Sequence, residues 1–189
     1  MLVALVSVSA FAQFRVQGAL SVGGYKDNDN FNIAPGLAAR VLYEYNLGAV
    51  GSNEVYYISA GAGFVQNNTT LKSDSDTKVN VNWIQIPVMI GSDYSLARGT
   101  IYTAVGLYYG YALSGKGENG SLSMDFVSED SAFRLFNRHD FGWVVQAGFS
   151  LPCNLGIYAG FNGGFLDICC EEGTSARNDI LEVGLMFKF

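Results

Sequence analysis

The sequence predicts an all-β fold, an eight-stranded antiparallel up-and-down transmembrane β-barrel. Large apolar side chains recur at every second residue in eight segments, and this period of two is typical of strands. The connections between the segments alternate between long and short, as in a barrel with tight turns at one end and loops at the other. The second face of each segment carries glycine, small polar groups and a few charges, so the charge-rich outer surface of a soluble barrel is missing.

Composition places the chain in one domain and excludes two function classes. A length of 189 residues fits a single domain, and 49% hydrophobic with only 15% charged residues suits a sheet that keeps few charges outside. After the N-terminus there is no apolar run of about 18 residues, so helical membrane spans are not expected. A net charge of −6 argues against nucleic acid as a partner.

Residues 1–12 form an apolar segment that ends in the small-x-small pattern Ala10-Phe11-Ala12. This pattern is typical of the end of a secretory signal peptide, and it predicts export with cleavage before Gln13. The usual basic region at its start is missing, so the true start codon is an open question. The predicted domain organisation is a signal-peptide remnant over 1–12 and a barrel domain over 13–189.

The first four strands are predicted over residues 14–25, 33–47, 54–66 and 79–94. In the first strand Phe14 and Val16 share one face, whereas Arg15 and Gln17 share the other. The polar run 26–30 and the polar run 67–78 are predicted as long loops, and the glycine-containing run 48–53 as a short turn.

The last four strands are predicted over residues 100–113, 139–151, 155–165 and 180–189. The short turns 95–99 and 152–154 precede the first and third of them. The run 114–138 is predicted as the longest loop, and the run 167–177 as a second loop before the last strand.

The last strand carries a row of large apolar side chains on one face, ending in Leu185, Phe187 and Phe189. This row resembles the C-terminal signal of bacterial outer-membrane β-barrels, which the barrel-assembly machinery reads. The resemblance implies that this machinery is a partner and that the protein resides in the outer membrane, in contact with its lipids.

Charged and amide side chains fall on the inward faces. Because an eight-stranded barrel is only wide enough to be filled by side chains, we interpret them as a polar plug rather than a solute pathway. Arg40 and Glu182 lie midway along strands that are separated by one other, so we expect them to pair, with Cα atoms about 10 Å apart. The predicted plug consists of Arg40, Glu44, Gln85, Asp140, Gln146 and Glu182.

Two internal motifs carry a family resemblance. Residues 83–89 (Trp-Ile-Gln-Ile-Pro-Val-Met) and residues 137–142 (Asn-Arg-His-Asp-Phe-Gly) resemble strands of the PorT-like outer-membrane β-barrel domain family. The likeness extends over about residues 14–189 and implies a small barrel in the bacterial outer membrane. One branch of that family assists a protein secretion system, so this role is an alternative function.

Enzymatic activity is not predicted, and no cofactor is expected. The chain has one histidine, His139, and its neighbour Asp140 points to the opposite face of the same strand. Cys153, Cys169 and Cys170 are interpreted as loop thiols, because they do not supply the ligand set of a metal site. A soluble lipocalin-like barrel is a further alternative, but it requires apolar residues inside and charges outside.

The predicted function is therefore that of a monomeric, non-enzymatic outer-membrane barrel for envelope structure or surface binding. Binding would use the long loops, since loops on rigid scaffolds often carry recognition. The candidate loop residues are Met124, Phe126, Phe133 and Phe136.

Overall fold

The computed structural model describes residues 12–26, 31–50, 52–71, 78–119, 122–125, 137–168 and 176–189. Nearly all of the described residues lie in antiparallel strands. The strands are β1 (Ala12–Lys26), β2 (Phe31–Val50), β3 (Glu54–Leu71), β4 (Lys78–Leu96), β5 (Gly99–Asn119), β6 (Leu122–Asp125), β7 (His139–Ser150), β8 (Leu155–Gly164) and β9 (Arg177–Lys188).

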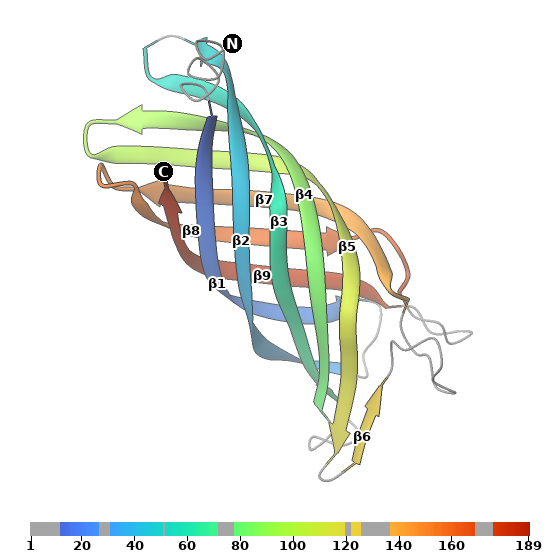
Figure 1. The fold of residues 1–189 in the computed structure, drawn as a ribbon. Coiled ribbons are helices and arrows are strands. Elements are labelled where there is room, and N and C mark those ends of the chain that lie inside the picture. Colours follow the sequence, from blue (N-terminus) through green and yellow to red (C-terminus); the bar gives the residue numbers. More distant parts are fainter. Residues whose placement is uncertain are drawn as a thin grey trace, which may run out of the picture.

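Eight of these strands close into a barrel (Figure 1). Neighbours follow the order β4-β3-β2-β1-β9-β8-β7-β5, and pairing of β4 with β5 closes the ring. The last strand lies antiparallel to the first, with Val16 opposite Phe187 and Leu20 opposite Val183. The predicted eight-stranded up-and-down barrel is confirmed.

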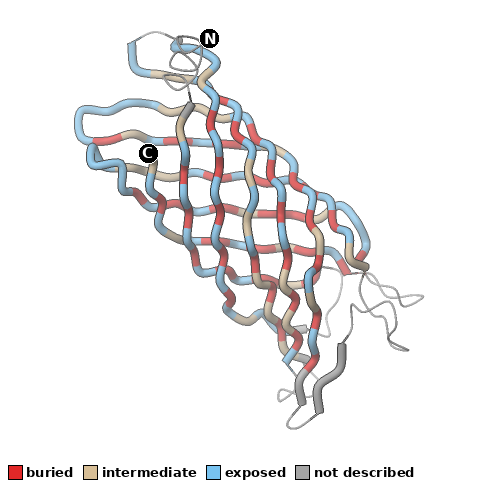
Figure 2. The backbone as a smooth tube through the Cα atoms, viewed as in Figure 1, coloured by how far each residue is buried: buried red, intermediate tan, exposed pale blue. Residues whose placement is uncertain are grey.

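The two faces of each strand differ sharply in exposure (Figure 2). In β4 the outward Val88 is 53% exposed, whereas the inward Gln85 is 1% exposed. Apolar side chains cover the outside, whereas the inside combines charged and amide side chains with aromatic and aliphatic ones. A soluble barrel would instead carry charges on its outer surface. Among the described residues there is no helix long and apolar enough to cross a membrane.

Several strands run further than their polar composition indicates. β3 continues to Leu71 and β5 to Asn119, so the predicted loops 67–78 and 114–138 are wrong over these residues. The ladder persists because Thr70 opposite Lys78 and Lys78 opposite Glu118 still pair. The change to polar side chains marks where the strand leaves the apolar outer surface rather than where it ends. The short strand β6 pairs only with the end of β5.

Glycine is required where a strand backbone approaches its neighbour closely. A Cβ atom at Gly61 would lie 2.0 Å from the carbonyl oxygen of Val41, and one at Gly106 would lie 2.0 Å from that of Val88. Any larger residue would push β2 from β3 or β4 from β5. These glycines therefore allow the tight curvature of a narrow barrel.

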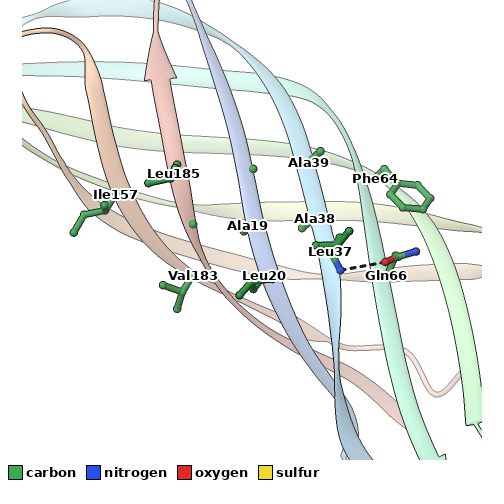
Figure 3. Close-up of a pocket in the computed structure, with 12 residues that line it drawn as sticks. Ala19, Leu20, Leu37, Ala38, Ala39, Phe64, Gln66, Ile157, Val183 and Leu185 are labelled. Carbon is green, nitrogen blue, oxygen red and sulfur yellow. Dashed lines mark hydrogen bonds between the residues drawn. The ribbon is translucent and has the colours of Figure 1, made fainter.

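A β-bulge interrupts the pairing of β2 with β3 between Ala34 and Ala38. Two side chains of β3 replace the lost ladder bonds. The backbone N–H of Leu37 donates to Gln66 Oε1 at 3.2 Å (Figure 3), and Asn68 Nδ2 donates to the carbonyl oxygen of Pro35 at 2.8 Å. Unpaired backbone groups on an apolar outer surface cost free energy. The two side-chain amides reduce this cost because they pair with the N–H of Leu37 and the carbonyl oxygen of Pro35.

Candidate functional site: the filled interior of the barrel

Four charged side chains meet at the end of the barrel that carries the short turns. Arg15 Nη2 lies 2.8 Å from Glu44 Oε1 and 3.5 Å from Asp93 Oδ1. Lys188 Nζ lies 2.9 Å from Glu44 Oε2 and also contacts Asp93 Oδ2. The contacts of Glu44 are ionic, because neither oxygen is aligned with an N–H as a hydrogen bond requires. Two cations and two anions therefore balance each other in the "mouth cluster", as we name these four residues.

Aromatic rings hold the cations of the mouth cluster in place. Arg15 Cζ lies 3.9 Å from the ring centroid of Tyr102 and 5.4 Å from that of Tyr57. Lys188 Nζ lies 5.6 Å from the Tyr57 centroid. Cation–π attraction adds to ionic attraction, so Arg15 can stay 2% exposed. A pocket of about 340 Å³ opens from the turns onto Arg15, Asp93 and Lys188.

A second cluster occupies the middle of the barrel and contains the predicted ion pair. Arg40 and Glu182 pair through both guanidinium Nη atoms, with Nη2 2.6 Å from Glu182 Oε1. Arg40 Nη2 also donates to Gln85 Oε1 at 3.0 Å, and Asn162 Nδ2 donates to Glu182 Oε1 at 2.8 Å. The carboxylate thus has several donors as well as its counter-ion. These hydrogen bonds and the ion pair offset the free-energy cost of removing both charges from water.

Two glutamines cross the interior beside this pair. Gln17 Nε2 donates to Gln146 Oε1 at 3.0 Å and to the hydroxyl of Tyr102 at 3.4 Å. Tyr102 also covers Arg15, so it connects the middle cluster to the mouth cluster.

A third cluster lies nearer the loop end, around Asp140. Tyr108 donates its hydroxyl proton to Asp140 Oδ2 at 2.7 Å, and Asn178 Nδ2 donates to the same oxygen at 3.1 Å. Asn67 Nδ2 in turn donates to Asn178 Oδ1 at 2.5 Å. Strands β3, β5, β7 and β9 are joined in this way across the barrel.

Apolar side chains cover the interior beyond Asp140. Ile168 and Ala176 come from the predicted loop 167–177 and are fully buried, and their backbones are joined by a 2.9 Å hydrogen bond. The full cluster comprises Tyr25, Val79, Val81, Trp83, Ala112, Ile168 and Ala176. Buried side chains therefore lie along the described interior from the mouth cluster to the loop end.

His139 lies on the other side of the barrel wall from Asp140. Its Nδ1 is 2.6 Å from the hydroxyl of Tyr109 on the exposed outer face, whereas Asp140 is fully buried. A histidine and a carboxylate separated by the sheet cannot act together as base and orienting group. Within the described ranges, no group of three His, Cys, Asp or Glu residues is placed to hold a metal ion.

All six predicted plug residues point inward and are at most 2% exposed. Three of them, Arg40, Gln85 and Glu182, make one cluster, whereas Glu44 and Asp140 belong to separate ones and Gln146 pairs with Gln17. The predicted set did not include several interior polar residues, although strand alternation would have indicated them. They include Arg15, Gln17, Asp93, Asn162, Asn178 and Lys188, and also Asn67, which lies in a stretch predicted as loop.

The remaining predicted site residues lie on the outside or beyond the described residues. Leu185, Phe187 and Phe189 face outward, with the last two rings 4.8 Å apart and the N–H of Phe189 bonded to the carbonyl of Phe14. Met124 belongs to strand β6 rather than to a loop. The structure does not describe Phe126, Phe133 and Phe136, nor Cys169, Cys170 and the signal segment before Ala12. Cys153 is an exposed free thiol in a turn.

Comparison with solved structures identifies barrels of similar size. Neisserial surface protein A (NspA) is 13% identical over 94% of this chain and 97% of its own, with a TM-score of 0.52. The attachment invasion locus protein Ail of Yersinia pestis is 13% identical over 94% and 97%, with a TM-score of 0.46. OprG from Pseudomonas aeruginosa is 11% identical over 95% and 96%, with a TM-score of 0.47. The likeness to NspA supports the fold alone.

Among curated proteins there is no significant match. The family model described as the outer membrane protein beta-barrel domain matches residues 6–169, which is most of the chain. This match agrees with the closed eight-stranded barrel and its apolar outer surface. The chain therefore belongs to the outer membrane protein beta-barrel domain family.

Proposed function

We propose that the protein is a monomeric, non-enzymatic barrel whose lumen is closed by side chains and which serves envelope structure or surface binding. The Arg40–Glu182 pair with its amide neighbours is the observation that carries this proposal. The cluster crosses a lumen too narrow to leave a wide aqueous path beside filled side chains. The mouth cluster and the Asp140 cluster support the proposal further, because they place side chains in the lumen on either side of the Arg40–Glu182 pair.

Electrical recording in planar lipid bilayers tests the closed lumen. The wild-type barrel is expected to insert without stepwise ion conductance, because three clusters of side chains cross the narrow lumen. Arg40→Ala combined with Glu182→Ala removes the middle closure and serves as the comparison. Steady, reproducible conductance steps from the wild-type protein would contradict a closed lumen and favour a channel.

We further propose that residues 1–12 are removed before Gln13 and that the barrel-assembly machinery inserts the mature chain. The apolar segment with its small-x-small end and the outward row at Leu185, Phe187 and Phe189 support these steps. The motifs at residues 83–89 and 137–142 resemble strands of the PorT-like outer-membrane β-barrel domain family, which supports the same destination. N-terminal sequencing of protein from purified outer membranes is expected to begin at Gln13, and any other first residue would contradict the cleavage site.

Two roles are open to a closed barrel, and one experiment separates them. The β5–β6 hairpin extends away from the barrel (Figure 1), which supports a binding role for the region around Met124, Phe126, Phe133 and Phe136. Cells lacking the protein would first be tested for sensitivity to detergent. If a chain without residues 126–136 restores resistance, the role is structural; if it folds but fails to restore resistance, the loop carries the function.

A further inference from the structure

The outer face of the barrel carries an apolar hollow across β9, β1, β2 and β3 (Figure 3). It exists because Gly18 and Ala39 place almost no side chain on the outward surface between larger neighbours. A Cβ atom at Gly18 would meet nothing within 4 Å. The hollow has a volume of about 810 Å³, and Leu20, Leu37, Phe64, Ile157, Val183 and Leu185 surround it.

A polar pocket adjoins this hollow on the loop side of the same surface. We name it the amide pocket, and its volume is about 280 Å³. Its residues are Gln66, Asn68, Asn80, Asn82 and Lys116. Gln66 lines both the apolar hollow and the amide pocket, so the two are direct neighbours on the outer surface.

The amide pocket lies where the strands leave the apolar part of the surface. On β3 the outward residues change from Phe64 to Gln66 and Asn68, and on β4 they change from Ile84 to Asn82 and Asn80 toward the loop end. An apolar hollow with a polar pocket at its loop end matches an amphiphile whose chain lies in the membrane and whose headgroup lies at the outer surface.

The chemistry of the amide pocket indicates a headgroup that is both hydroxyl-rich and anionic. Gln66 Oε1 and Asn68 Nδ2 hold the β2 bulge, and the other amide atoms of these side chains, Gln66 Nε2 and Asn68 Oδ1, take no part in those two bonds. Amides can donate to and accept from sugar hydroxyls. Lys116 lines the amide pocket and is exposed, as is Lys78 at the start of β4, so this part of the surface carries positive charge that suits a phosphate.

We propose that the apolar hollow and the amide pocket together bind a phosphorylated glycolipid of the outer leaflet. One acyl chain occupies the apolar hollow, the sugar contacts the amides and a phosphate contacts Lys116. This site rests on the proposed outer-membrane orientation, with the loops outward. It gives the barrel a specific lipid partner on its wall, separate from the closed lumen and from the loops.

Lipid retention measured by native mass spectrometry tests the site. The full barrel would be reconstituted in phosphatidylcholine vesicles that contain a diphosphorylated disaccharide lipid, and then extracted in mild detergent. Lys116→Gln is expected to lower the retained glycolipid about two- to five-fold, as for the loss of one exposed charge contact. Ala39→Phe is expected to lower it as well, because the ring would occupy the apolar hollow. Gly18→Leu provides a second filling variant, since the structure leaves room for its side chain.

Matched controls place the same changes elsewhere on the barrel. Arg98→Gln removes one positive charge at the short-turn end, and Ala147→Phe enlarges an outward alanine on β7. Both are expected to retain glycolipid as the wild type does. Removing the phosphates from the lipid is expected to weaken retention to the level of Lys116→Gln.

Two outcomes would overturn the proposal. One is equal retention by the wild type, Lys116→Gln and both filling variants, and the other is equal retention of phosphatidylglycerol, which lacks the sugars. Each variant must show the heat-modifiable gel band of a folded barrel. A wild-type chain that inserts but retains no glycolipid contradicts only this site, whereas a chain absent from outer membranes contradicts the proposed function as well.

Discussion

Removing either member of the Arg40–Glu182 pair is expected to destabilise the barrel strongly. Both side chains are at most 2% exposed, and breaking a buried pair leaves one uncompensated charge, which costs about 3–5 kcal/mol. Arg40→Met leaves Glu182 with Asn162 and Tyr158 as neutral donors, so its cost should lie near the lower value. Glu182→Leu leaves the Arg40 guanidinium with neutral neighbours, Gln85 Oε1 and Tyr158, and without a counter-ion, so its cost should lie near the upper value.

The double variant should cost much less than the two single variants together. It removes both charges, and only the hydrogen bonds of Gln85, Asn162 and Tyr158 are lost, at roughly 1 kcal/mol each. The single variants together cost at least about 6 kcal/mol, so the coupling free energy should be at least about 3 kcal/mol.

Urea unfolding of the barrel in lipid vesicles, followed by tryptophan fluorescence, provides the free energies of unfolding. Ser59→Ala is the control, because Ser59 is a buried inward residue whose Oγ has no hydrogen-bond partner among the described residues. It should leave the free energy of unfolding nearly unchanged. A coupling free energy indistinguishable from zero would refute the reasoning.

Three further changes probe other parts of the barrel. Gln66→Met leaves the Leu37 N–H without its acceptor on a lipid-facing surface and should cost about 1–3 kcal/mol in the same unfolding assay; an unchanged value would contradict the role of Gln66 at the bulge. Tyr108→Phe removes a 2.7 Å bond to buried Asp140 and should cost about 1–3 kcal/mol, and no loss would mean that water replaces the hydroxyl. Phe189→Ala should reduce the heat-modifiable fraction in cells, and normal insertion would argue against an assembly signal there.

Alternation of residue type was sufficient to predict the barrel and the orientation of its side chains. The inward positions of Arg40 and Glu182, and their meeting across β1, follow from strand parity and strand spacing alone. Strand ends were harder to predict, because Asn67 and Asn68 are polar residues in a continuing ladder. The polarity of a segment indicates whether its side chains face water or an apolar environment. Whether its backbone belongs to a strand depends on the neighbouring strands that it pairs with.

The contacts within the interior could not be predicted in the same way. Asp93 joins the mouth cluster because β4 approaches β9 across the barrel, and no spacing along the chain encodes that meeting. The amide pocket likewise depends on the bulge in β2, which shifts the register between Ala34 and Ala38. Pro35 and Gly36 mark the position of the bulge, but the side chains that satisfy it come from another strand.

The interior charges also distinguish between registers of β9 along β1 that the apolar pattern alone would allow equally. A shift of β9 along β1 by two residues keeps every side chain on its proper face, so the alternation of apolar residues alone does not oppose it. The same shift would move Glu182 and Lys188 by about 7 Å relative to β1. Arg40 and Glu44 would then each lose their partner on β9. Ion pairing therefore favours one register of β9 against β1 over the other registers that the apolar side chains would allow. This register is set when the first and the last strand pair.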